Sequence, residues 1–82
     1  MATLIMFRSL TYAQRAARSL QRRGIPAEIT KAPQGTTDRG CTYCLRVSDQ
    51  RLDASLNALQ NDRIEHGRVL QQNNGEYREV SL

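Results

Sequence analysis

The chain has 82 residues, with 12 basic and 8 acidic side chains, two cysteines and no tryptophan. This length corresponds to one small domain, and we expect a single domain over residues 1–82. The longest apolar run, residues 4–7, is far shorter than the roughly 20 residues of a membrane-spanning helix, and the N-terminus lacks the pattern of a secretory signal. Two cysteines are too few for the disulfide framework of a small secreted domain. We therefore expect a cytoplasmic protein without a membrane partner.

The net charge of +4 raises the question of a nucleic-acid partner. The arginines are scattered along the chain, however, and only Arg22 and Arg23 are adjacent. Aromatic residues make up 5% of the chain, which is too few for a base-stacking platform. The spacing of Arg15, Arg18 and Arg22 indicates the outer face of a helix rather than a binding stripe. We therefore do not expect nucleic acid to be the partner.

The first half of the chain predicts a strand, a helix and a second strand. Residues 3–7 are β-branched and apolar, which is typical of a short buried strand. Ser9 is the expected N-cap of a helix whose apolar stripe consists of Leu10, Ala13, Ala17 and Leu20. Gly24 supplies a left-handed stop, after which Ile25 packs back on the helix and Pro26 prevents its continuation. A second strand is expected over residues 27–32, and a loop over residues 33–40.

The second half predicts a strand, a helix and a hairpin. Apolar and polar residues alternate from Thr42 to Val47, as in a half-buried strand. Ser48 or Asp49 caps a helix that ends near residues 61–62 and has the apolar stripe Leu52, Leu56 and Leu59. Two strands, residues 68–72 and 76–80, flank an Asn-Gly pair that favours a type I′ turn. This order predicts an α+β fold, a ferredoxin-like β-α-β-β-α-β sandwich with an added C-terminal hairpin strand.

The segment from Arg39 to Arg46 contains the residues with the clearest chemical potential. Cys41 stands where a glycine-containing loop enters a strand, and the amides near Gly40, together with Arg39, would stabilise its thiolate. Arg46 is either a solvated strand residue or an anion partner for Cys41. Cys44 lies within the strand, where a regular geometry points the two thiols to opposite faces, so a disulfide would require a displaced Cys41. A buried, apolar role is favoured for Cys44, and for Cys41 both interpretations stay open.

Other kinds of site lack the residues they require. The Cys-x-x-Cys motif of thioredoxins opens a helix, whereas residues 45–47 continue a strand. A structural zinc ion needs four ligands, and the chain offers two cysteines and His66, which we interpret as an exposed polar residue. No Ser/His/Asp constellation and no phosphate-binding glycine pattern stands out. We therefore expect neither a metal nor a cofactor.

Several features of the chain together form a recognisable pattern. A strand ends in Phe and is followed by Ser, and the next helix stops at a Gly-Ile pair. A later loop then closes on a cysteine, before a strand with the sequence apolar-small-Leu-Arg. This pattern resembles a small bacterial family of unknown function, the Se/S carrier protein-like family. The matching positions are Phe7, Ser9, Ala13, Leu20, Gly24, Ile25, Pro33, Cys41, Tyr43, Leu45 and Arg46. The chain departs from the family at Gln34, where arginine is usual, and at Thr42, where glycine is usual.

The resemblance implies a carrier whose Cys41 thiol holds sulfur or selenium between a donor and an acceptor protein. In this hypothesis Cys44, where the family usually has a small residue, is a candidate resolving thiol. Such a protein transfers a group and is not an enzyme with turnover of its own. A non-catalytic ferredoxin-like interaction module, such as a homodimer, is the alternative, because residues 4–7 are apolar on both faces of the first strand. An RNA-recognition motif shares the element order, but Cys41 and Arg46 occupy two positions where it requires aromatic residues.

Overall fold

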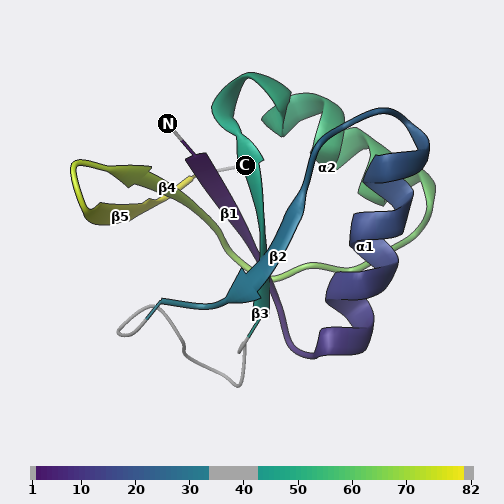
Figure 1. The fold of residues 1–82 in the computed structure, drawn as a ribbon, viewed down its shortest axis with the longest axis horizontal. Coiled ribbons are helices and arrows are strands. Elements are labelled where there is room, and N and C mark those ends of the chain that lie inside the picture. Colours follow the sequence, from purple (N-terminus) through teal and green to yellow (C-terminus); the bar gives the residue numbers. More distant parts are fainter. Residues whose placement is uncertain (1, 34–42, 81–82) are drawn as a thin grey trace.

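The computed structural model describes residues 2–33 and 43–80, which form an α+β fold with a five-stranded antiparallel sheet and two helices (Figure 1). The strands are β1 (Ala2–Phe7), β2 (Glu28–Lys31), β3 (Tyr43–Ser48), β4 (Val69–Asn73) and β5 (Glu76–Glu79). The helices are α1 (Leu10–Arg22) and α2 (Leu52–Asn61), and a 3-10 turn (Asp49–Arg51) precedes α2. The type and order of these elements confirm the sequence-based prediction.

The strands lie in the order β2-β3-β1-β4-β5, and each pairs antiparallel with its neighbours. Both helices lie on the same side of the sheet, and the β4–β5 hairpin extends away from them (Figure 1). The main core forms between the helices and that side of the sheet. Its large, fully buried side chains are Ile5, Phe7, Leu20, Leu45, Leu59 and Val69.

Local signals place the ends of α1 and the hairpin turn where they were predicted. The Ser9 hydroxyl accepts a hydrogen bond from the Tyr12 amide at 3.3 Å, as an N-cap does. Gly24 has a φ of +73°, and the Ile25 amide donates to the Leu20 carbonyl at 2.9 Å, which closes the helix in a Schellman motif. Asn74 and Gly75 have φ values of +54° and +82°, as a type I′ turn requires.

Leu10 departs from the predicted apolar stripe of α1. Its side chain is 41% exposed, whereas Ala13, Ala17 and Leu20 are buried. Leu10 shares the angular position of Ala17 on the helix but lies seven residues earlier, which is about 10 Å along the axis. Because it is the first residue of the helix, it lies beyond the part of α1 that packs on the sheet.

The opposite side of the sheet has a smaller buried cluster. Leu4, Met6, Cys44 and Leu70 are each at most 4% exposed, and Leu4 pairs with Leu70 while Met6 pairs with Cys44 across the strands. Tyr77 from the terminal hairpin packs against this cluster. The first strand is thus buried on both faces, and its own chain contributes the cover on the side without helices.

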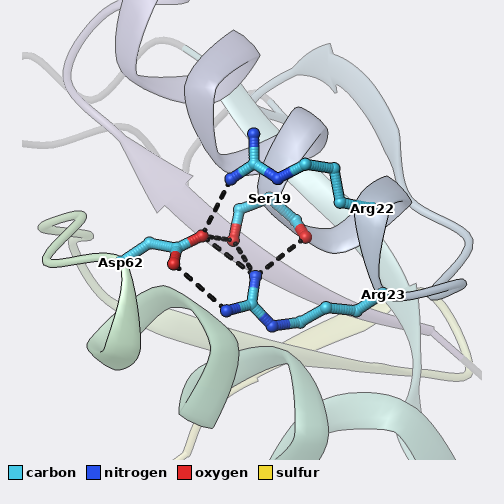
Figure 2. A network of polar contacts seen from close by, with 4 residues as sticks. All are labelled: Ser19, Arg22, Arg23 and Asp62. Carbon is cyan, nitrogen blue, oxygen red and sulfur yellow. Dashed lines mark hydrogen bonds and ion pairs between the residues drawn. The ribbon is translucent and has the colours of Figure 1, made fainter.

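A polar network joins the C-terminal ends of the two helices, as Figure 2 shows. Asp62 directly follows α2 and accepts a hydrogen bond from the buried Ser19 hydroxyl of α1 at 2.5 Å. Arg23 donates to both carboxylate oxygens, at 2.9 and 3.1 Å, and Arg22 donates at 3.1 Å. The hydrogen bonds from Arg23 and Ser19 hold the pKa of Asp62 well below its ordinary value of 3.8. Because the ionised carboxylate is stabilised only in the folded chain, the stability that this network gives to the helix packing depends on pH.

We expect Asp62→Asn to lower the melting temperature by a few degrees at neutral pH, because it removes the negative charge and one of the two carboxylate oxygens that accept from Arg23 and Ser19. The folded-state pKa of Asp62 is depressed, so its stabilisation is present above the ordinary carboxyl pKa and is lost as the pH falls through the lower folded value. The difference in melting temperature between the variant and the wild type should therefore become smaller below about pH 4.

Thermal melts at graded pH measure this difference. The exposed Arg8–Glu65 pair provides the control, because its side chains are 63% and 80% exposed and Glu65→Gln should change the melting temperature little. An Asp62→Asn deficit that persists undiminished down to about pH 2 would contradict the role of the ionised carboxylate.

Candidate functional site

Three of the predicted site residues, Arg39, Gly40 and Cys41, lie outside the described residues. The segment that contains them joins β3 at Tyr43 in the sequence. Tyr43 pairs with Phe7, the last residue of β1, and with Lys31, the last residue of β2. This end of the sheet is therefore the framework to which the cysteine segment is attached.

Cys44 is a free thiol on β3, and its side chain is fully buried. Its strand neighbours are Met6 and Thr30, and its sulfur lies 4.0 Å from the Lys31 carbonyl oxygen, a weak contact. Burial raises the pKa of the Cys44 thiol from 9.0 to about 11, because removal from water disfavours the thiolate. The thiol is therefore neutral at physiological pH, which favours the packing role predicted for it.

Arg46 is exposed on the same side of β3 as Cys44, the side without helices. It lies directly across from Glu28 of β2 and lines an open groove of about 590 Å³ with Ser48 and Gln72. Arg46 is three residues further along the strand than Tyr43, or about 10 Å from the end where the cysteine segment joins. The structure thus places Arg46 on a solvated face, which is one of the two roles its sequence position allowed.

A second polar cluster, which the sequence did not predict, lies where β1 ends. Arg8 pairs with Glu65 at 3.0 Å and its guanidinium lies 5.1 Å from the centre of the Tyr12 ring. His66 is half-buried rather than exposed, and its Nδ1 lies 2.7 Å from the Gly67 carbonyl oxygen. A carbonyl oxygen only accepts hydrogen bonds, so Nδ1 carries the proton and Nε2 of the neutral ring is an acceptor.

Tertiary contacts alone assemble this second cluster. Arg8 and Glu65 are 57 residues apart in sequence, and no spacing rule connects them. The Gly67 amide donates to the Met6 carbonyl at 2.7 Å, and this contact brings the segment after α2 beside the end of β1. The cluster therefore lies at the same end of the sheet as Tyr43.

The described residues provide little for a metal or for stacked bases. Among residues 2–33 and 43–80, no group of three or more His, Cys, Asp or Glu side chains could hold a metal ion. On the side of the sheet without helices, the two central strands present Leu4, Met6, Cys44 and Arg46, whereas Tyr43 packs against the core on the helix side. An RNA-recognition motif stacks bases on aromatic residues of those strands, so this arrangement disfavours an RNA-binding function. Neither of the two described helices has the length and hydropathy to cross a bilayer.

Comparison with known proteins identifies a family. Residues 2–71 match the model of the family described as Putative Se/S carrier protein-like. The matched range includes all five of the predicted site residues. Searches of curated proteins and of solved structures return no match.

Proposed function

The chain belongs to the Putative Se/S carrier protein-like family, and we propose that it holds sulfur or selenium on the thiol of Cys41 for transfer to a partner protein. The family description supports the class of function and names no residue. Which atom holds the cargo therefore has to be inferred from the chemistry of the chain itself.

The burial of Cys44 is the observation that carries the assignment to Cys41. The chain has two cysteines, and only a thiolate is an effective sulfur nucleophile. Cys44 is fully buried and its pKa is raised to about 11, so it is a poor nucleophile and a poor resolving thiol in the folded chain. Cys41 is the remaining thiol. Arg39 and Gly40 precede it directly in the sequence, and we assign them the role of stabilising its thiolate.

The proposed loading step is a transfer between sulfur atoms without net oxidation or reduction. The Cys41 thiolate attacks the terminal sulfur of a persulfide on the donor protein. The sulfur–sulfur bond of the donor breaks, its cysteine leaves as a thiolate with the bonding electron pair, and a new sulfur–sulfur bond forms on Cys41. The proton of the terminal sulfur moves with it. A donor that holds selenium in the terminal position reacts in the same way. To unload the carrier, an acceptor nucleophile attacks the terminal atom, the bond from that atom to the Cys41 sulfur breaks, and Cys41 leaves as a thiolate with the electron pair.

This chemistry defines the partners and the limits of the role. A carrier requires a donor and an acceptor protein and performs no turnover of its own. We further infer that residues 1–82 act as one domain with the ferredoxin-like arrangement and an added hairpin strand, supported by the strand order β2-β3-β1-β4-β5. A homodimer has less support than the sequence indicated, because Tyr77 of the same chain packs on the apolar side of β1 that lacks helices.

Mass spectrometry after exposure to a small persulfide tests this function. The reduced chain is incubated with cysteine persulfide, and intact and digested masses locate any added sulfur. We expect the wild type and Cys44→Ala to gain one sulfur atom at Cys41, and Cys41→Ser to gain none, because Cys44 is buried. Sulfur on Cys44, or no sulfur on the folded wild type, would overturn the assignment. A parallel incubation with a selenium-containing analogue distinguishes the two cargoes.

A further inference from the structure

We propose that the exposed face of α1 docks an acidic surface of the protein that donates the sulfur or selenium. The docking surface consists of Arg15, Arg18 and Arg22 on that face and of Leu10 at the N-terminal end of the helix. This inference rests on the proposed carrier function, because it names the kind of partner surface that the loading step would engage.

Charge is distributed unevenly over the described residues. Residues 8–23 contain five arginines and no acidic residue. Arg8 pairs with Glu65, while Arg22 and Arg23 share the single carboxylate of Asp62. Arg15 and Arg18 are exposed and have no acidic partner in the described part of the chain. The five arginines of this segment therefore have only two carboxylate partners among the described residues, and the outer face of the helix is positively charged.

The geometry of α1 gathers this charge into one surface, and the proposal revises the sequence-based interpretation of these arginines as an outer helix face without a binding role. Arg15, Arg18 and Arg22 follow at steps of three and four residues, so they lie on one side of the helix over about 10 Å. The buried side, with Ala13 and Leu20, packs against the core. Figure 1 shows α1 at the periphery of the molecule, on the same side of the sheet as α2.

Leu10 adds an apolar contact at the N-terminal end of α1, beside the arginine side rather than on it, because it shares the angular position of Ala17. It is the large hydrophobic residue that stands exposed among the described residues, at 41%. It follows Phe7 by three residues, and Phe7 pairs with Tyr43, where the cysteine segment joins the sheet. Arginine is enriched in protein interfaces, and a partner seated here would lie beside that end of the sheet.

An acidic protein surface fits these features better than a nucleic acid does. Two unpaired cations, three residues apart and so about 5 Å along the helix axis, are few compared with the roughly 6–10 phosphate contacts of proteins that bind DNA tightly. The exposed face of α1 also has no aromatic residue for base stacking, since Tyr12 is half-buried beneath the Arg8 guanidinium. Complementary charge is instead a common means of steering one protein onto another.

The test separates docking from sulfur chemistry. The Cys41→Ser chain, which the proposed function leaves unable to accept sulfur, is labelled with ¹⁵N and titrated with a cysteine desulfurase, the class of enzyme that forms a protein persulfide. We expect amide signals of α1 to shift. The Arg15→Glu/Arg18→Glu variant should bind roughly tenfold more weakly or worse, and binding of the unsubstituted surface should weaken as salt is added.

The matched control changes the net charge equally at exposed arginines elsewhere, in Arg51→Glu/Arg78→Glu. This control should retain the affinity. Equal weakening by both pairs, shifts confined to other elements, absence of binding, or saturable binding of single-stranded oligouridine through Arg15 and Arg18 would each overturn the inference. Transfer of sulfur to the wild type is measured separately, so a chain that binds through α1 but accepts no sulfur would refute the carrier function and leave the docking surface intact.

Discussion

Replacement of Leu20 by alanine is expected to lower the free energy of unfolding by about 2–5 kcal/mol. Leu20 is fully buried in the core between α1 and the sheet, and truncation removes apolar contacts and leaves a cavity there. A domain of this size has a total stability on the order of 5–15 kcal/mol, so the variant would lose a large fraction of it. Urea denaturation followed by circular dichroism measures the change.

Leu10→Ala is the matched control, because it makes the same chemical change in the same helix. Leu10 is 41% exposed, so the substitution should change the free energy of unfolding by no more than about 0.5 kcal/mol. The sequence pattern places both leucines on one apolar stripe and by itself predicts that the two variants lose similar amounts of unfolding free energy. Equal destabilisation by the two variants would mean that Leu10 is buried in solution, and it would remove the apolar part of the proposed docking surface.

Alkylation of Cys44 in the folded Cys41→Ser variant is expected to be at least about 100-fold slower than that of an ordinary thiol near pH 8. The Cys44 pKa of about 11, compared with 9.0 for an ordinary thiol, lowers the thiolate fraction by about this factor. Burial slows the reaction further, because the reagent must wait for local opening of β3. Iodoacetamide labelling with and without urea provides the measurement, and rapid labelling of the folded variant would contradict the buried position of Cys44.

The raised pKa of Cys44 also predicts a loss of folding stability at alkaline pH. The pKa of Cys44 is raised in the folded chain, so its neutral thiol contributes stability fully below about pH 9, and this contribution is lost between about pH 9 and 11 as the unfolded chain ionises. Lysine and tyrosine side chains titrate in the same range, so the wild type is compared with Cys44→Ala at each pH. The advantage of the wild type should decrease across that window. A constant difference would show that the thiol has the same pKa in both states.

The labelling and pH experiments on Cys44 together determine how the proposed function can be tested. If Cys44 is inert in the folded chain, then any persulfide found on the native protein reports on Cys41. If Cys44 reacts readily, a resolving role for it regains support, and the assignment of the carrier thiol requires both single variants.

Many local elements could be predicted from a few neighbouring residues. Ser9, the Gly24–Ile25 pair and the Asn74–Gly75 pair each act within one turn of chain, so their caps and turns are confirmed as predicted. The chain order of strands and helices also follows from periodicity alone. The family resemblance depends on the same residues, and the match over residues 2–71 confirms it.

Contacts between distant segments could not be predicted in this way. Ser19 and Asp62 are 43 residues apart, and Arg8 and Glu65 are 57 apart, so only the packing of the helices and of the segment after α2 makes them partners. The exposure of Leu10 has the same origin, because the extent of the sheet decides where the buried stripe of α1 begins.

The sequence by itself determined the element order, the family and the presence of two thiols three residues apart. Only the tertiary structure decided that Cys44 is a neutral core residue, because its burial depends on Leu4 and Met6 from the adjacent strand β1 and on Leu70 from β4, the strand beyond it. A periodic pattern reports which residues share a face, whereas burial, and with it the pKa of a thiol, depends on what another segment places against that face. Cys41 is assigned as the carrier thiol because Cys44 is buried, whereas the role of Cys41 itself stays a prediction from the sequence.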